Sequence, residues 1–309
     1  MKLPPARGKE LFDYLQKLIT ESPNPESYNL DRLDTIQILE LINSEDATVP
    51  LIVRRQIPKI AQAVEMVYDS LSKGGRLIYI GAGTSGRLGV IDAAECPPTF
   101  GSEPGQIIGL IAGGAAAMIR SAEGVEDDIL AAEKDISNIN VGGLDVVMGL
   151  TASRRTPYVI AALNRALSLK AKTIFLTCNP SIEPDCSYDL IINPVTGPEI
   201  LTGSTRMKAA LAEKMILTMI TTAAMVKLGK VYGNMMVDLQ ATSQKLIERS
   251  KKVIMSVCGC DYQTAAHYLQ EAGGHVKTAI VMAKLGCDSV TARERLARAG
   301  GFIYKVLEK

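Results

Sequence analysis

Two carboxylates, Glu95 and Glu126, are the strongest candidates for acid–base chemistry in this sequence of 309 residues. Glu95 stands just before Cys96-Pro97-Pro98 at the end of an expected helix, where the helix dipole disfavours a negative charge. Alternatively, Glu95 is a solvated side chain on the protein surface. Glu126 lies in the acidic run 123–128, which is also typical of a helix N-terminus. Spacing alone does not show that the two meet, so an acid–base pair and two separate structural acids are both open hypotheses.

Three turns that precede expected helices carry Ser and Thr hydroxyl groups. They are GAGTSGR (81–87), TASRRTP (151–157) and GSTRMK (203–208). Backbone N–H groups at such turns bind anions, although Ser and Thr are also ordinary helix caps. Three such turns without a Walker lysine predict a phosphate monoester that is held largely by neutral donors. The candidate binding residues are Thr84, Ser85, Gly86, Ser153, Thr156, Ser204, Thr205 and Lys208.

The first of these turns also fits a dinucleotide-binding loop, because Gly81, Gly83 and Gly86 match the GxGxxG spacing. Against this interpretation, the second apolar run ends in Ala112-Gly113-Gly114 rather than in an acidic residue. None of the six cysteines forms a CxxC pair, and the two histidines do not lie at metal-ligand spacing. We therefore expect neither a zinc site nor a bound dinucleotide, and cysteines that remain reduced.

Five short apolar runs predict the strands of a parallel sheet, whose carboxyl edge would carry the turns. Helix-like segments between most of the runs indicate right-handed crossover units. Single long helices are expected over 47–72 and 206–228, the second being a core or dimer-interface helix. Residues 261–309 predict three short helices separated at Gly273-Gly274 and Gly286. The five runs are 76–80, 107–112, 145–150, 173–177 and 190–192.

The composition favours a globular α/β protein, with 47% hydrophobic residues, 5% aromatic residues and no tryptophan. The net charge is +1 and both signs are interspersed, which argues against a nucleic-acid partner. No apolar stretch reaches the ~20 residues of a membrane span, and residues 1–10 lack the apolar core of a signal peptide. We expect a cytoplasmic protein that binds a small molecule and neither a membrane nor a nucleic acid.

Taken together, seven segments make the sequence resemble the bacterial N-acetylmuramic acid 6-phosphate etherases over nearly the whole chain. The resemblance implies a SIS-type three-layer sandwich with a central five-stranded parallel sheet, followed by a small C-terminal helical module of ubiquitin-associated type. The expected domains are an N-terminal helical segment (1–45), the SIS sugar-phosphate-binding domain (46–245) and a three-helix module (246–309). The segments are GAGTSGRLG (81–89), ECPPT (95–99), LIAGG (110–114), EGVED (123–127), RTPYV (155–159), LTGSTRMKA (201–209) and GKVYGN (229–234).

The same resemblance implies a cofactor-independent homodimer that removes D-lactate from N-acetylmuramic acid 6-phosphate and leaves N-acetylglucosamine 6-phosphate. On the matching positions, Glu95 is the general acid and Glu126 the general base. One departure concerns the second turn, where Arg154 stands in place of an expected glycine. Two rivals remain open: an aldose–ketose isomerase on the same fold, and a sugar-phosphate-sensing regulator without catalysis.

Overall fold

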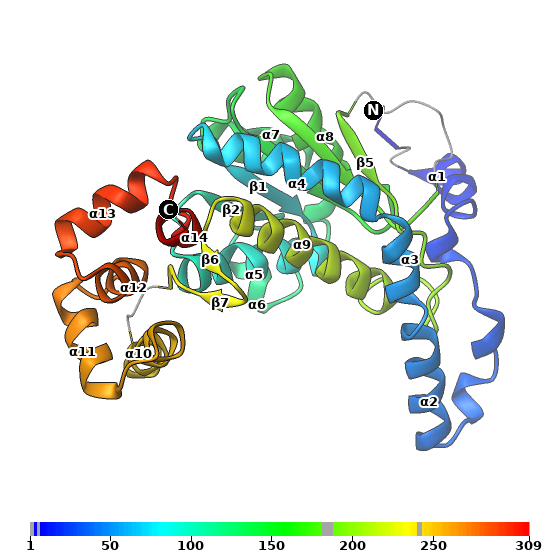
Figure 1. Cartoon of the computed structure of the whole chain (residues 1–309). Helices are drawn as coiled ribbons and strands as arrows, with labels where there is room; N and C mark the ends of the chain where they lie inside the picture. Colours follow the sequence, from blue (N-terminus) through cyan, green and yellow to red (C-terminus); the bar gives the residue numbers. More distant parts are fainter. Residues whose placement is uncertain (1–2, 5–6, 181–187, 240–242, 309) are drawn as a thin grey trace. The chain divides into compact units, whose positions relative to one another are not determined.

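The computed structural model describes residues 3–4, 7–180, 188–239 and 243–308 (Figure 1). The chain divides into two compact units by the proximity of its residues. The first unit comprises Met1–Ala94 and Ile107–Ile220, and the second comprises Glu95–Gln106 and Thr221–Lys309. The expected domain boundaries near residues 45 and 245 describe a different division, and they stay a prediction.

A five-stranded sheet forms the centre of the first unit, and all of its pairings are parallel. The strand order is β2-β1-β3-β4-β5. Every residue of β1 and β3 is buried, as expected for parallel strands with helices on both faces. Each strand coincides with one of the five apolar runs, so the predicted α/β class is confirmed. The strands are β1 (Leu77–Gly81), β2 (Ile107–Ile111), β3 (Val146–Leu150), β4 (Lys172–Leu176) and β5 (Leu190–Ile192).

Helices cover the two faces of this sheet and complete a three-layer arrangement (Figure 1). On one face, α7 and α8 pack in a single core with Ile78 and Phe175. On the other face, α5 comes so close that a Cβ on Gly89 would lie 2.9 Å from the Tyr79 side chain. The helical elements between the strands are α5 (Gly83–Phe100), α6 (Ala116–Ile119), η4 (Val125–Asp127), α7 (Ile129–Asn138) and α8 (Pro157–Ser168).

The N-terminal part is helical, and it differs from prediction at one point. The helix expected over 47–72 is broken at Gln56 into two helices. Pro58 explains the break, because proline has no N–H and its ring clashes with the carbonyl four residues earlier. The elements are α1 (Gly8–Leu15), η1 (Ile19–Glu21), η2 (Pro25–Ser27), η3 (Leu30–Arg32), α2 (Thr35–Asp46), α3 (Val49–Arg55) and α4 (Ile57–Ser72).

The predicted apolar helix is α9 (Lys208–Lys227), which begins in the first unit. By length and composition it is the one helix among the described residues that could cross a membrane, and 56% of its apolar window is buried. A core helix of a soluble protein passes the same test. The helix also contains Glu213, whose side chain is fully buried.

In the part of the second unit that the structure describes, helices follow a short hairpin, and residues 261–308 form four helices rather than the three expected. Five helices follow the hairpin and share one apolar core that includes Ile254, Ile280 and Ile303. The predicted breaks at Gly273-Gly274 and Gly286 are confirmed. The elements are β6 (Val231–Tyr232), β7 (Met235–Met236), α10 (Gln244–Cys258), α11 (Tyr262–Glu271), α12 (Val276–Leu285), α13 (Ser289–Arg298) and α14 (Ile303–Leu307).

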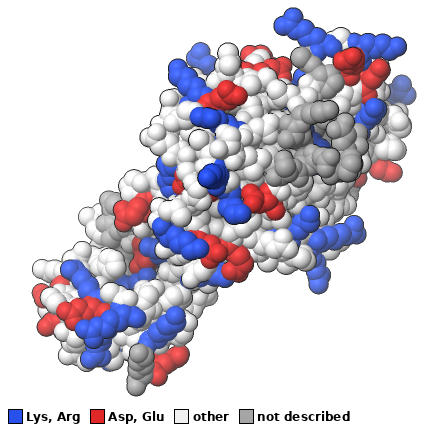
Figure 2. All heavy atoms as spheres, turned by 90° about the horizontal axis from the view of Figure 1, so that it is seen from above, with Lys and Arg blue, Asp and Glu red and all other residues white. Residues whose placement is uncertain are grey.

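The charged side chains follow the interspersed pattern of the sequence. On the face shown in Figure 2, Lys and Arg side chains alternate with Asp and Glu side chains rather than gathering in one field.

Candidate functional site

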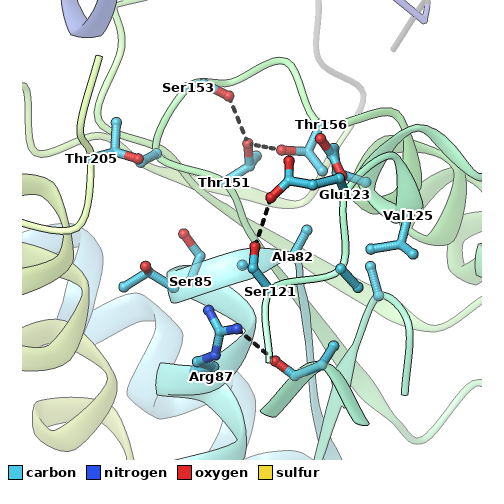
Figure 3. Close-up of a pocket in the computed structure, with 17 residues that line it drawn as sticks. Ala82, Ser85, Arg87, Ser121, Glu123, Val125, Thr151, Ser153, Thr156 and Thr205 are labelled. Carbon is cyan, nitrogen blue, oxygen red and sulfur yellow. Dashed lines mark hydrogen bonds between the residues drawn. The ribbon is translucent and has the colours of Figure 1, made fainter. Parts of the chain in front are cut away.

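A pocket lies at the carboxyl ends of β1, β2 and β3, where open α/β sheets bind their ligands. Its walls come from the loops that follow these three strands and from the turn that precedes α9. In Figure 3 the labelled side chains of these loops surround one space. The sheet topology thus brings together segments that are far apart in the sequence, because the carboxyl ends of parallel strands meet at the same edge of a sheet.

The glycine-rich turn forms the base of the pocket. Thr84 and Ser85 lie in the first turn of α5 and line the pocket. Gly86 does not line it but lets the turn close, since a Cβ there would lie 2.7 Å from the Gly81 carbonyl oxygen. The N-terminal N–H groups of α5 have no partner within the helix, and with the helix dipole they favour an anion at this end.

Ser85 is joined to a buried carboxyl group beneath the pocket. Its hydroxyl donates a 3.0 Å hydrogen bond to Glu213 Oε1. Glu213 is fully buried, and burial raises its pKa to about 8 although the hydrogen bond from Ser85 acts in the opposite direction. Sequence reasoning missed this residue, because only the packing of α9 against α5 reveals it.

The loop after β3 contributes a group of hydrogen-bonded hydroxyls. Thr151 Oγ1 lies 2.7 Å from Thr156 Oγ1 and 3.4 Å from Ser153 Oγ, and all three residues line the pocket (Figure 3). The backbone N–H of Arg155 donates to Ser153 Oγ over 3.3 Å. These bonds hold the hydroxyls of Ser153 and Thr156, both predicted binding residues, at one side of the pocket.

The turn before α9 contributes less than expected. Thr205 lines the pocket, whereas Ser204 and Lys208 are not among the residues that line it. Lys208 was expected to help hold the phosphate, but it is 4% exposed and its Nζ forms an ion pair with Glu45 of α2. Buried ammonium groups need such a partner, so this lysine ties α9 to the N-terminal helices.

Glu126 lies in the pocket wall, on the η4 turn, where it is half-buried. Glu123 lines the same wall and accepts a 2.8 Å hydrogen bond from the Ser121 hydroxyl (Figure 3). An ion pair of 3.5 Å between Arg155 and Asp127 joins the η4 turn to the loop after β3. The acidic run therefore supplies pocket carboxylates rather than only a helix N-terminus.

Arg87 supplies a positive charge to the pocket, which the sequence analysis did not single out. Its Nη2 donates to the Ala117 carbonyl over 2.7 Å, and its Nε donates to the Met118 carbonyl over 3.2 Å. Both bonds fix the guanidinium at the pocket floor (Figure 3). The signal in the sequence for this role was the position of Arg87 at the end of the GTSGR run (83–87).

Glu95 is exposed and is not among the residues that line this pocket. It belongs to the second unit, whereas the residues that line the pocket belong to the first. The structure therefore brings Glu126 to the hydroxyl-rich loops, and the role of Glu95 stays a prediction.

Among the described residues, no group of three or more His, Cys, Asp or Glu side chains has the arrangement of a metal site. The pocket instead presents hydroxyls, backbone amides, one guanidinium and two carboxylates. Such a site can hold a phosphate through neutral donors and one cation, and can move a proton through a carboxylate.

Comparison with known proteins shows the family of this chain. A family model described as the glucokinase regulatory protein N-terminal SIS domain matches residues 59–167.

Three of the similar proteins illustrate the match, and each carries the name N-acetylmuramic acid 6-phosphate etherase. The relative from Pasteurella multocida (strain Pm70) is 48% identical over 86% of this chain and 88% of its own length. That from Salinibacter ruber is 50% identical over 88% of each chain. That from Klebsiella aerogenes is 50% identical over 86% of this chain and 89% of its own length. Identity at this level, over almost the full length of each relative, means that this chain belongs to the N-acetylmuramic acid 6-phosphate etherase family.

Proposed function

We propose that this protein is a carbon–oxygen lyase that converts N-acetylmuramic acid 6-phosphate into N-acetylglucosamine 6-phosphate and D-lactate, in the catabolism and recycling of cell-wall amino sugars. The names of its relatives support this activity. The observation in the structure that carries the proposal is a single pocket in which the Glu126 carboxylate shares the walls with a hydroxyl-rich anion site.

The reaction requires one base and one acid. In the open-chain sugar the C1 aldehyde acidifies the proton on C2, and the Glu126 carboxylate removes that proton. The C3–O bond then breaks, and Glu95 as the acid gives a proton to the lactate oxygen. Water then adds to the resulting C2–C3 double bond: Glu95, now ionised, takes a proton from the water as its oxygen bonds to C3, and Glu126 returns its proton to C2. Two carboxyl groups in opposite protonation states thus return to their starting forms after each turnover.

The phosphate is the handle that orients the reacting carbons. The hydroxyls of Thr84, Ser85, Ser153, Thr156 and Thr205 line the pocket and can donate to phosphate or sugar oxygens. The α5 amides add charge-complementary donors. Binding energy from this remote group lowers the barrier at C2 and C3.

Three of the predicted binding residues contribute through the shape of the site. Gly86 allows the close approach of β1 and α5. Ser204 precedes the pocket residue Thr205 in the turn before α9, and the Lys208 pair with Glu45 holds the start of that helix.

The test is to incubate the protein with N-acetylmuramic acid 6-phosphate and to measure D-lactate, in parallel with Glu126→Gln and Glu95→Gln. We expect lactate from the parent and a loss of about 10²–10⁴-fold in kcat for each variant, as is typical when a general base or acid is removed. Glu133→Gln on the exposed face of α7 is the matched control and should keep parental activity.

Two outcomes would replace the proposal. Thermal stabilisation by the sugar phosphate without lactate release would favour the non-catalytic regulator. Conversion of a 6-phosphate sugar between aldose and ketose forms, again without lactate, would favour the isomerase.

We also propose the location, oligomeric state and cofactor requirement of the protein. It acts in the cytoplasm on a small sugar phosphate, works as a homodimer, and requires no cofactor. The family resemblance supports the dimer, and light scattering of the purified chain measures it directly.

A further inference from the structure

A buried acid without a cation lies directly beneath the proposed phosphate site. Glu213 on α9 is 0% exposed, and its Oε1 accepts a 3.0 Å hydrogen bond from Ser85, whose side chain lines the pocket. Glu213 Oε2 is also buried and has no hydrogen-bond partner among the described residues. An ionised carboxylate at this position would lose its hydration without a compensating partner. Burial therefore favours the neutral, protonated form of Glu213.

The surroundings of Glu213 agree with a neutral acid at pH 7. No lysine, arginine or histidine among the described residues forms an ion pair with it. The titratable side chain that interacts with it from the sheet side is Cys178, whose own pKa is raised well above the usual value by burial, then by Glu213 and Glu199. Burial raises the pKa of Glu213 to about 8.

The hydroxyl of Ser85 has one proton, and this limits what it can do. In the structure this hydroxyl donates to Glu213 Oε1. A phosphate oxygen only accepts hydrogen bonds, so Ser85 must turn its proton toward the pocket when phosphate binds. The bond to Glu213 survives this turn only if the acid becomes the donor.

We infer that Glu213 is a positioning residue that donates a hydrogen bond from its protonated carboxyl to Ser85 Oγ and so releases the Ser85 proton for the phosphate of the substrate. The inference rests on the proposed function of the pocket, and it adds a residue that acts through Ser85 and does not itself touch the ligand. The two hydrogen bonds in series polarise each other and strengthen the contact to phosphate.

An ionised Glu213 would weaken phosphate binding in two ways. It would keep the Ser85 proton for itself, and it would place a second negative charge near the phosphate in a poorly solvated region. Affinity for a phosphate monoester should therefore fall as pH rises through about 8, where Glu213 loses its proton. The phosphate is already a dianion above about pH 6, so its own titration does not produce this fall.

Calorimetric titration with N-acetylglucosamine 6-phosphate between pH 6.5 and 9.5 tests the inference, because this product is not turned over to lactate. For the parent we expect the Kd to increase by about tenfold per pH unit above about pH 8. Glu213→Gln should bind at pH 7 within about threefold of the parent and show no such increase, because its amide N–H donates at every pH. Glu213→Ala should bind about tenfold more weakly at all pH values.

Two further variants separate this effect from general damage. Glu133→Gln, an exposed glutamate on α7, should keep the pH profile of the parent. Ser85→Ala should weaken binding and reduce the dependence on pH, because the hydroxyl that Glu213 orients is gone and only the charge of ionised Glu213 still acts on the phosphate.

The inference is wrong if the Kd of the parent stays constant to pH 9.5, or if Glu213→Gln binds as weakly at pH 7 as Glu213→Ala. These results leave the proposed function intact as long as the parent binds the sugar phosphate. Failure of the parent to bind it at pH 7 would instead contradict the proposed site itself.

Discussion

Arg154 shows how a single residue can occupy a backbone conformation that favours glycine. Its φ is +62°, in the left-handed region, and its side chain is only 5% exposed. The guanidinium carbon lies 5.7 Å from the centre of the Phe175 ring. A desolvated cation–π contact contributes up to ~2 kcal/mol, which can offset the 1–2 kcal/mol that the left-handed conformation costs an ordinary residue. The side chain therefore compensates for the loss of the glycine expected at this turn.

This balance predicts a specific order of stability for two variants. Arg154→Ala keeps the strained backbone and loses the contact with Phe175, whereas Arg154→Gly loses the contact but relieves the strain. We expect both to be less stable than the parent, and the alanine variant to be less stable than the glycine variant by about 1 kcal/mol. Urea unfolding followed by circular dichroism measures the difference. A glycine variant that is the less stable of the two would show that the turn is not strained.

Among the secondary-structure elements, β1 and β3 are held in register at their starting ends by one carboxylate. Asp145 accepts hydrogen bonds from the backbone N–H of Arg76 at 3.0 Å and from the Arg76 side chain at 3.1 and 2.7 Å. The Gly142 N–H adds a fourth bond at 2.9 Å. Burial alone would raise the pKa of Asp145, but these bonds outweigh burial and lower it below 3.8.

A lowered pKa makes the contribution of Asp145 dependent on pH in a definite direction. The ionised form is the one bound in the folded state, so its stabilisation is complete above the unfolded pKa near 3.9 and is lost as pH falls through the lower folded pKa. We expect Asp145→Asn to reduce the free energy of unfolding by about 2 kcal/mol at pH 7. The difference from the parent should shrink below about pH 4.

Urea unfolding at pH 7, 5 and 3 measures this change. Asp69→Asn, at an exposed position of α4, serves as the control and should change stability by less than about 0.5 kcal/mol. A deficit for Asp145→Asn that is the same at pH 3 and pH 7 would show that packing, and not charge, is responsible.

For the whole molecule, the position of Glu95 bears on the proposed homodimer. Glu95 belongs to the second unit and is not among the residues that line the pocket of the first unit. A symmetric dimer offers a second source, since each copy can lend the same residue to the other. We therefore expect each site to combine Glu126 of one copy with Glu95 of another.

A mixed dimer tests this arrangement. Glu95→Gln and Glu126→Gln chains with different tags are co-expressed, and dimers that contain both are isolated through the two tags. One of the two sites in such a dimer would be intact, so lactate production should return to about half of the parental value. Each variant alone should stay inactive. An inactive mixed dimer would show that both carboxylates of a site belong to one chain, and a monomer in light scattering would remove the dimer altogether.

The sequence by itself determined the sheet and the type of site. The apolar runs located all five strands, because strands buried on both faces must be apolar throughout. The hydroxyl-rich turns located three walls of the pocket, because parallel strands end at the same edge of a sheet. The prediction of one helix over 47–72 was wrong at Gln56, although Pro58 was a local signal for the break.

Only the tertiary structure decided which of these groups act together. It turned Thr205 into the pocket and paired Lys208 with Glu45, although both belong to one short turn. It also placed Glu213 under Ser85 across 128 residues of sequence. Local patterns fix which face of an element is buried, but not which side chain of a distant element is opposite to it. Contacts of that kind depend on how the helices pack, and they control the protonation state of a buried acid.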